Sequence, residues 1–232
     1  MDIEILAYED TPLGVLCLRR RELLCNPGVM VTEVTLNHEF LMSSYLTESE
    51  RALSRLGLDR CQTTAGKPNL NAMVGGLGLG YTAMELLKSE SIASVEVIEF
   101  LPEVIGWTND GLVPLSEQLG ADSRLTISHG DVYGRLGEGG NSDFDLIVID
   151  VDHSPEDVLG EQSHKFYSES GLQIAKTHLR PGGVIGIWSY AESSPLLENM
   201  EVVFKDVTVE QVTVMNDLIR EEQTDWLFFG RR

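Results

Sequence analysis

Residues 70–88 read LNAMVGGLGLGYTAMELLK and place a strand, a glycine-rich turn and a helix in immediate succession. The apolar run 70–74 leads into the turn, and a helical pattern follows from residue 81. Glycines allow the backbone to turn sharply and to approach a ligand closely. A turn of this kind between a buried strand and a helix is typical of a nucleotide-type site. We therefore take Gly76, Gly78 and Gly80 as candidate ligand contacts.

Strand-like and helical segments alternate on the carboxyl-terminal side of this turn. Strands are predicted over 95–100, 124–128, 144–149 and 184–188, and helices over 101–110 and 166–178; further strand-like segments lie at 202–204, 207–214 and 226–229. The run FDLIVI at 144–149 is almost entirely apolar, as expected for a parallel strand that is covered on both faces. The pattern predicts an α/β fold with a mostly parallel sheet, whose strand near Leu70 is central and is flanked by those near Val95 and Phe144.

The amino-terminal part of the chain has a different pattern. It reads as short β-strands over 3–8, 14–18 and 29–36, followed by a helical stretch that begins at Phe40. The residues TESE at 47–50 form a capping-box signature before further helical residues. We predict a small β-region with a helix over residues 1–60 and a catalytic domain over residues 61–232.

Composition excludes several classes of protein. The chain carries 17 basic and 37 acidic residues, for a net charge of −20, which argues against a nucleic-acid partner. No apolar run has the length of a membrane helix, and the first residues do not resemble a signal peptide. The three cysteines form no CxxC pair, which favours reduced thiols and a cytoplasmic location. The only basic cluster, residues 19–21, is interpreted as a solvated hairpin.

Ligands of such sheets bind at the carboxyl ends of the strands, so the acids that follow the predicted strands are candidate site residues. Glu99 ends a strand 19 positions after Gly80, where a carboxylate can accept hydrogen bonds from both ribose hydroxyls. Asp131 follows the next strand and could accept a hydrogen bond from an adenine amine. Both residues also allow a structural interpretation, Glu99 as a solvated strand-end acid and Asp131 as a turn residue.

Asp150 follows the apolar strand 144–149 and is expected to be partly desolvated. Such a carboxylate could act as a general base or hold a cationic substrate. Asp152 and His153 come next in the loop, and His153 could shuttle protons or be an ordinary loop residue. Three oxygen and nitrogen ligands within four residues do not complete a metal shell, so no metal is expected.

The glycine turn also fits a dinucleotide fingerprint, because Gly78, Gly80 and Ala83 match G-x-G-x-x-A. Taken alone, this pattern would allow a nicotinamide enzyme. Asp131 and the acids from Asp150 onward indicate an adenosine site beside an acidic site instead. A dehydrogenase is therefore the third choice.

Taken together, the motifs resemble the spermidine synthase family, the polyamine aminopropyltransferases. The resemblance covers residues 60–190 and extends more weakly to the amino terminus; its motifs are VGGLGLG at 74–80, VEVIE at 95–99, Gly130-Asp131, FDLIVID at 144–150, Phe166-Tyr167 and LRPGG at 179–183. It implies a Rossmann-like class I methyltransferase fold, with a seven-stranded sheet whose last strand, near Trp226, is antiparallel. It also implies aminopropyl transfer from decarboxylated S-adenosylmethionine, or use of S-adenosylmethionine itself, with an amine or polyamine as acceptor. We expect a homodimer.

The resemblance assigns a role to each candidate. Glu99 would hold the ribose, Asp131 the adenine amine, and Asp150 would orient and deprotonate the attacking amine, with Asp152 as a second acid of the catalytic loop. The chain departs from the family at Gly78, where an aspartate is usual, and at 38–44, which lacks the Tyr-His pair of the family's gate. His153 also stands where an acid is usual. A methyltransferase that uses S-adenosylmethionine and a catalytically silent binding protein are the alternative functions.

Overall fold

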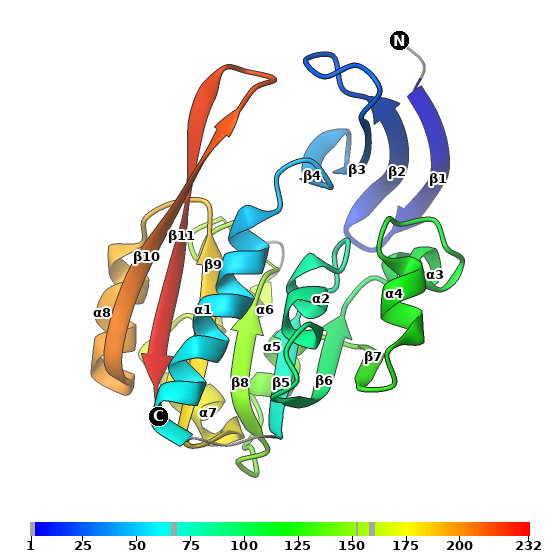
Figure 1. Ribbon diagram of the computed structural model, residues 1–232. Coiled ribbons are helices and arrows are strands. Elements are labelled where there is room, and N and C mark those ends of the chain that lie inside the picture. Colours follow the sequence, from blue (N-terminus) through cyan, green and yellow to red (C-terminus); the bar gives the residue numbers. More distant parts are fainter. Residues whose placement is uncertain (1–2, 66–68, 152, 158–160) are drawn as a thin grey trace.

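The computed structural model describes residues 3–65, 69–151, 153–157 and 161–232, and it contains two separate β-sheets (Figure 1). The strands are β1 (Ile3–Thr11), β2 (Gly14–Glu22), β3 (Met30–Leu36), β4 (Glu39–Ser43), β5 (Leu70–Gly75), β6 (Ile92–Glu99), β7 (Leu125–His129), β8 (Phe144–Ile149), β9 (Leu179–Ser189), β10 (Lys205–Asn216) and β11 (Glu221–Arg231). The helices are α1 (Glu48–Ala65), α2 (Tyr81–Leu87), α3 (Pro102–Asn109), α4 (Ser116–Ala121), α5 (Val132–Leu136), α6 (Glu161–Phe166), α7 (Glu169–Ala175), the 3-10 turn η1 (Lys176–His178) and α8 (Ser194–Val203).

The larger sheet has the strand order β10-β11-β9-β8-β5-β6-β7. Strands β5 to β9 pair in parallel, and β11 runs antiparallel to both β9 and β10. The predicted central position of β5 between β6 and β8, and the antiparallel last strand, are both confirmed. Every residue of β8 is buried, because helices cover both faces of the sheet.

The smaller sheet consists of β1 to β4 in sequential antiparallel order. A helical stretch predicted from Phe40 is wrong, since this segment is β4 and Phe40 pairs with Thr35 of β3. The two-residue turn between these strands has positive φ at Asn37 (52°) and His38 (70°), which suits a tight hairpin. The Asn37 side chain accepts from the backbone N–H of Val15 at 2.9 Å, which fixes the turn against β2.

Helix α1 crosses from the smaller sheet onto the larger one and packs mainly against β8, β9 and α2. The predicted domain boundary at residue 60 falls inside this helix, and the division of the chain into domains remains a prediction. The single helix expected over 166–178 is divided into α6, α7 and η1, because Ser168 caps α7 by accepting from the N–H of Gly171 at 3.1 Å. The strand expected at 202–204 is wrong as well, since it overlaps the last turn of α8, where Val203 is buried and Val202 is exposed.

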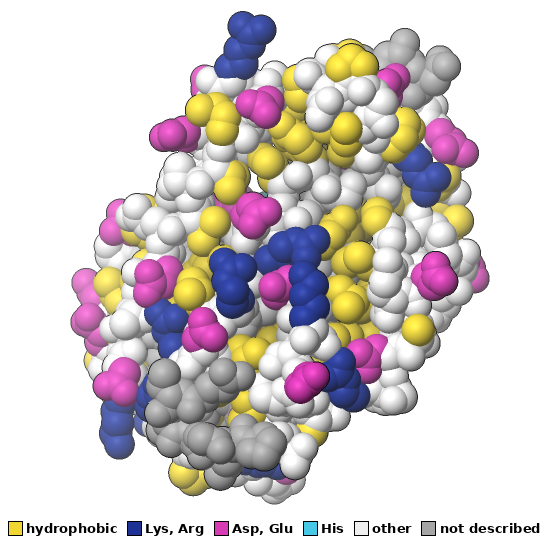
Figure 2. Space-filling model, in the orientation of Figure 1, with side chains coloured by type: hydrophobic (Ala, Val, Ile, Leu, Met, Phe, Trp, Pro, Cys, Tyr) yellow, Lys and Arg dark blue, Asp and Glu magenta, His cyan; other side chains and the backbone are white. Residues whose placement is uncertain are grey.

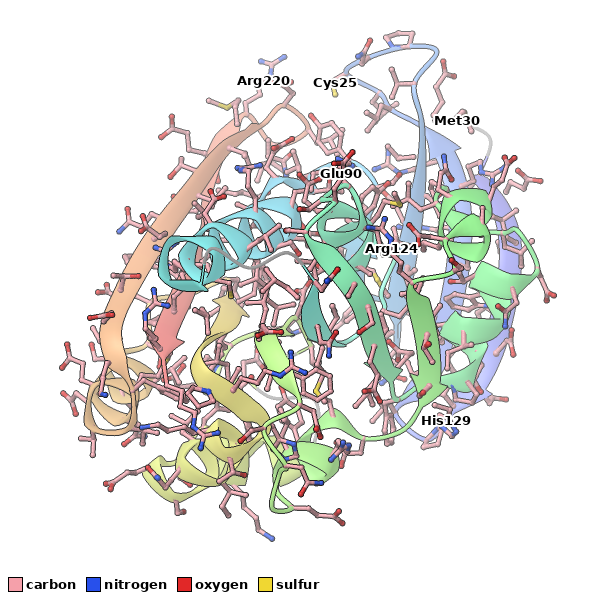
Figure 3. The ribbon with its side chains drawn as sticks, turned by 60° about the horizontal axis from the view of Figure 1, so that its bottom comes forward. Cys25, Met30, Glu90, Arg124, His129 and Arg220 are labelled. Atoms are coloured by element: carbon pink, nitrogen blue, oxygen red, sulfur yellow. The ribbon has the colours of Figure 1, made fainter. Side chains whose placement is uncertain are left out.

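The amino-terminal ends of the parallel strands carry structural contacts, whereas their carboxyl-terminal ends lead into the loops with the candidate site residues. Arg124, at the start of β7, donates to the carbonyl oxygens of Leu87, Ser89 and Ile92 and thereby fixes the turn between α2 and β6. Figure 3 shows Arg124 just before β7 and His129 at the opposite end of the strand. The loop that contains Asp131 follows His129. Hydrogen bonds from Arg124 thus stabilise the amino-terminal side of the sheet, and the candidate site residues lie on the carboxyl-terminal side. None of the helices within the described ranges is long and apolar enough to cross a membrane.

Candidate active site

A cavity of about 910 Å³ lies between the smaller sheet and the carboxyl ends of the parallel strands. The loops after β5, β6, β7 and β8 line it, together with β4, the start of α1 and the β10–β11 hairpin. In the space-filling view, hydrophobic side chains gather around the hollowed upper half of the face (Figure 2). The cavity therefore lies where the parallel sheet predicts a ligand site.

The glycine turn forms one wall of this cavity, and its backbone requires glycine. Gly76 has φ of 89°, and a Cβ there would lie 2.3 Å from the backbone oxygen of Asp150. Gly80 has φ of 88°, and a Cβ there would lie 2.4 Å from Leu119 Cδ1. Glycine at position 76 therefore allows close approach to the backbone after β8, and glycine at position 80 allows close approach to the Leu119 side chain of α4.

Glu99 is buried at the end of β6 and lines the cavity. Its Oε2 accepts from the N–H of Leu77 in the glycine turn, and its Oε1 accepts from the N–H of Leu101, both at 2.8 Å. Burial raises the pKa of Glu99, although these backbone donors oppose the rise. The backbone N–H groups of Gly78 and Phe100 act in the same direction, so the side chain braces the turn while it lines the cavity.

Asp131 lies in the loop after β7 and also lines the cavity. Its Oδ1 accepts from the N–H of Tyr133 at 2.9 Å, which makes it the N-cap of α5. The turn-residue interpretation of Asp131 is thus correct. Its second oxygen leaves room for the predicted contact with an adenine amine, which remains a prediction.

Asp150 follows β8, and its backbone N–H donates to the Gly75 oxygen at 3.0 Å. Its Oδ2 accepts from the Thr82 hydroxyl at 2.6 Å. Burial raises the pKa of Asp150 to about 6; the Thr82 hydrogen bond opposes the rise and the charge of Asp225 adds to it. A carboxyl with a pKa near neutrality is suited to accept a proton during a reaction.

Four further acids, Glu33, Glu48, Glu50 and Asp225, line the cavity, and sequence reasoning placed none of them there; Glu50 and Asp225 interact with Asp150 through their charges. Glu50 was assigned to the capping box of α1, but its side chain lines the cavity, where burial and then the charge of Asp150 raise its pKa to about 8. Asp225 comes from β11, and burial raises its pKa while the Ser49 hydroxyl opposes the rise. We call Glu50, Asp150 and Asp225 the carboxylate triad. The sequence carries one weak signal for it, an aspartate directly before the apolar run 226–229.

The loop after Asp150 is only partly described. Asp152 lies outside the described residues. His153 lines the cavity, with its Nδ1 3.7 Å from Asp157 Oδ2 and its ring edge-on to Tyr190. Within the described ranges, no group of three or more His, Cys, Asp or Glu side chains could hold a metal ion.

Gly78 and Met42 lie next to each other, and both belong to segments in which the sequence departs from the spermidine synthase motifs. Gly78 has φ of 51°, and a Cβ there would lie 3.3 Å from the Met42 sulfur. Met42 belongs to β4, within the segment 38–44 that lacks the Tyr-His pair of the spermidine synthase motif. A thioether therefore lies beside the position at which the family carries an aspartate.

The basic cluster at residues 19–21 is not the solvated hairpin that the sequence predicts. Arg19 and Arg21 lie on the cavity side of β2 and both pair with buried Glu33, whereas Arg20 points away and donates to the Leu112 oxygen at 3.5 Å. Alternation along the strand separates the three side chains in this way.

No protein-family model matches the chain. In sequence, it is 26% identical over 189 residues to the polyamine aminopropyltransferase of Prochlorococcus marinus, a match that covers 74% of this chain and 61% of that protein. It is 25% identical over 117 residues to the polyamine aminopropyltransferase of Oceanobacillus iheyensis, a match that covers 50% of this chain and 22% of the relative. The chain thus spans less than two thirds of the length of these relatives.

In structure, the chain is similar to a spermidine synthase solved in complex with the transition-state analogue AdoDATO, with a TM-score of 0.75 and 16% identity. That match covers 98% of this chain and 73% of the other. The spermidine synthase of Thermotoga maritima gives a TM-score of 0.74 at 15% identity, with coverages of 98% and 72%. The expected class of fold is therefore confirmed.

Proposed function

On the premise that this chain is a divergent relative of the spermidine synthase-like proteins, we propose that it is a transferase acting on an adenosylsulfonium donor and an amine acceptor. The group transferred is the aminopropyl chain of decarboxylated S-adenosylmethionine. The observation that carries this proposal is the carboxylate triad beside the glycine turn, in one cavity with Glu99 and Asp131. A cytoplasmic location and a homodimer remain predictions.

The nucleoside half of the donor would lie along the glycine turn. Glu99, which lines the cavity beside the turn, would accept hydrogen bonds from the ribose hydroxyls. Asp131 would accept a hydrogen bond from the adenine amine. Both contacts would orient the sulfonium toward Asp150, which is linked to the turn through the Gly75 oxygen.

The triad would supply the acceptor half of the site. Three acids with raised pKa values in one cavity repel one another, and an ammonium group placed among them would favour their ionised forms. Asp150 would take the proton of the attacking amine. The amine nitrogen would then form a bond to the propyl carbon as the carbon–sulfur bond breaks, and the bonding electrons would leave with methylthioadenosine. The protein contributes proximity, alignment and a neutral nucleophile.

Product analysis tests this proposal directly. The protein is incubated with decarboxylated S-adenosylmethionine, with and without a panel of diamines and polyamines, and the released nucleoside is identified. We expect methylthioadenosine only when an amine is present. Absence of any nucleoside product, together with tight nucleoside binding, would favour a silent binding protein.

One observation favours methyl transfer as a second candidate function. Gly78 and Met42 leave the donor pocket without the aspartate expected in the glycine turn, which relaxes exclusion of the carboxylate of S-adenosylmethionine. The variant Gly78→Asp would add an anion there, so we expect it to weaken S-adenosylmethionine binding relative to the decarboxylated compound. Release of S-adenosylhomocysteine by the native protein would establish the methyltransferase function.

A further inference from the structure

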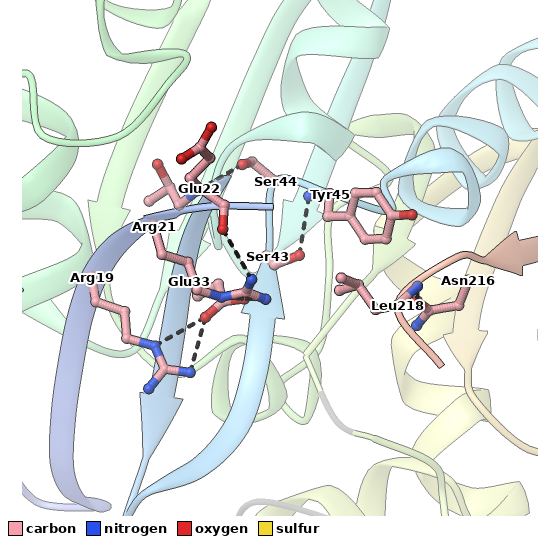
Figure 4. A network of polar contacts seen from close by, with 10 residues as sticks. Arg19, Arg21, Glu22, Glu33, Ser43, Ser44, Tyr45, Asn216 and Leu218 are labelled. Atoms are coloured by element: carbon pink, nitrogen blue, oxygen red, sulfur yellow. Dashed lines mark hydrogen bonds and ion pairs between the residues drawn. The ribbon is translucent and has the colours of Figure 1, made fainter. Parts of the chain in front are cut away.

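Arg19 and Arg21 are the only lysine or arginine side chains that line the cavity within the described part of the chain. Both come from β2 and converge on Glu33 of β3, which has a side-chain exposure of 5% (Figure 4). In a chain with a net charge of −20, two guanidinium groups on one carboxylate leave a local excess of one positive charge inside a cavity.

Glu33 has no acceptor capacity left for more donors. Nε and Nη2 of Arg19 both contact Oε2, at 3.0 and 2.9 Å, and Nε and Nη2 of Arg21 both contact Oε1, at 2.8 and 2.5 Å. Burial alone would raise the pKa of Glu33, but the hydrogen bonds from Arg21 and Arg19 outweigh it and lower the pKa. Glu33 therefore stays ionised and holds both arginines in place.

The arginines keep donors for another partner. Each contacts Glu33 through the Nε side of its guanidinium, which leaves the fork formed by Nη1 and the outer N–H of Nη2. Among the described residues, Arg19 Nη1 has no hydrogen-bond partner, and Arg21 Nη1 makes only a long contact of 3.4 Å with the Glu22 oxygen. Tyr45, Asn216 and Leu218 line the same cavity. In Figure 4 they lie on the Arg21 side of the Arg19–Glu33–Arg21 group. A planar fork of two N–H donors matches a carboxylate in shape and charge.

We propose that Arg19 and Arg21 form a subsite for a carboxylate group of a bound substrate. The cavity then holds two charged regions, with the arginine pair on the smaller sheet and the carboxylate triad on α1, β11 and the loop after β8. A substrate that carries both an ammonium and a carboxylate group satisfies both regions, whereas a plain diamine satisfies only the triad. The inference rests on the proposed function for the identity of the substrates, in which the carboxylate belongs either to the acceptor or to the donor.

Matched ligand pairs that differ only in one carboxylate test the subsite. Ornithine against putrescine examines the acceptor, and S-adenosylmethionine against its decarboxylated form examines the donor. Calorimetry on the full chain gives the affinity for each compound. We expect the native protein to prefer the carboxylated member of at least one pair.

Arg19→Gln removes the excess charge and leaves Arg21 to neutralise Glu33. We expect this variant to reduce the preference for the carboxylated compound by about tenfold or more, which is the usual contribution of a charge-assisted hydrogen bond. The affinity for the compound without the carboxylate should change little. Arg20→Gln is the matched control, because it removes the same charge from the opposite face of β2 and should keep the native preference. Arg19→Lys retains the charge but not the planar fork, and should lose part of the preference.

Two results would overturn the subsite. One is a native protein that binds neither carboxylated compound more tightly than its partner. The other is an Arg19→Gln protein that is folded by circular dichroism and keeps the native preference, which would leave Arg19 with only a structural role on Glu33. Nucleoside release, measured separately on the same combinations, tests the transferase proposal: failure to release any nucleoside would reject the transferase and leave the binding comparison intact.

Discussion

Glu99 combines two tasks at the scale of a single side chain, since it braces the glycine turn and is proposed to hold the ribose. We expect Glu99→Gln to weaken binding of methylthioadenosine by about tenfold or more, because the charge behind the ribose hydrogen bonds is lost. Calorimetry measures the affinity. Glu96→Gln is the control, because Glu96 lies on the same strand but does not line the cavity. Equal affinities for the native protein and Glu99→Gln would remove the ribose role.

Asp150 is expected to act in the transfer step and not in nucleoside binding. Asparagine retains its shape and can accept from the Thr82 hydroxyl, but it cannot take a proton from the amine. We expect Asp150→Asn to lower the transfer rate by about 10² to 10⁴-fold, the range that general bases contribute, with unchanged affinity for methylthioadenosine. Asp157→Asn, an exposed acid of the same loop, should keep the native rate. If Asp150→Asn lost nucleoside binding and thermal stability together, Asp150 would be a scaffold residue.

At the scale of elements, the turn between β5 and α2 depends on its backbone conformation. Gly76→Ala would bring a Cβ against the Asp150 oxygen in a left-handed conformation, so we expect a loss of about 1–3 kcal/mol in the free energy of unfolding and weaker nucleoside binding. Gly106→Ala in α3 is the matched control, because a Cβ there meets nothing within 4 Å. Alanine favours helix there, so this change should stabilise the fold by up to about 1 kcal/mol. Denaturant unfolding compares the two variants.

The elements that could be predicted from the sequence are those with local signals. The run at 144–149 and the glycine turn indicate a buried parallel strand and a strand–turn–helix unit within a few residues, and both are present in the structure. The hairpin at Asn37-His38 was missed because its turn residues are neither glycine nor proline, the usual markers of a turn. The segment after it was therefore interpreted as a helix.

For the candidate site, too, the sequence predicts residues with local signals but not residues that distant elements bring to the cavity. Acids that directly follow predicted parallel strands could be found, because the carboxyl ends of such strands meet at one edge. Glu50 and Asp225 reach the cavity from α1 and from β11, 100 and 75 residues away from Asp150. Their positions depend on how the helix and the hairpin pack, and no local pattern reports that packing.

For the whole molecule, the carboxylate triad links folding stability to pH. Acids with raised pKa values hold protons in the folded chain that the unfolded chain has already released. The stability that they contribute is therefore complete below the ordinary carboxyl pKa and declines as the pH rises toward about 6 for Asp150 and about 8 for Glu50. His178 acts in the opposite direction over part of this range, because burial lowers its pKa.

Comparison of the native protein with Glu50→Gln isolates the triad, since the contribution of His178 is the same in both. Glutamine removes a charge that Asp150 and Asp225 oppose, so the variant should gain thermal stability relative to the native protein at pH 8 and little at pH 4. Each 1 kcal/mol of relieved repulsion raises the melting temperature of a chain of this size by about 2–4 °C. Melting curves between pH 4 and 8 measure the gain. The control is Glu48→Gln, which removes an exposed acid two residues earlier in α1 that also lines the cavity. A gain for Glu50→Gln that does not grow with pH would mean that Glu50 is ionised at little cost, and the ammonium site proposed around it would lose its electrostatic basis.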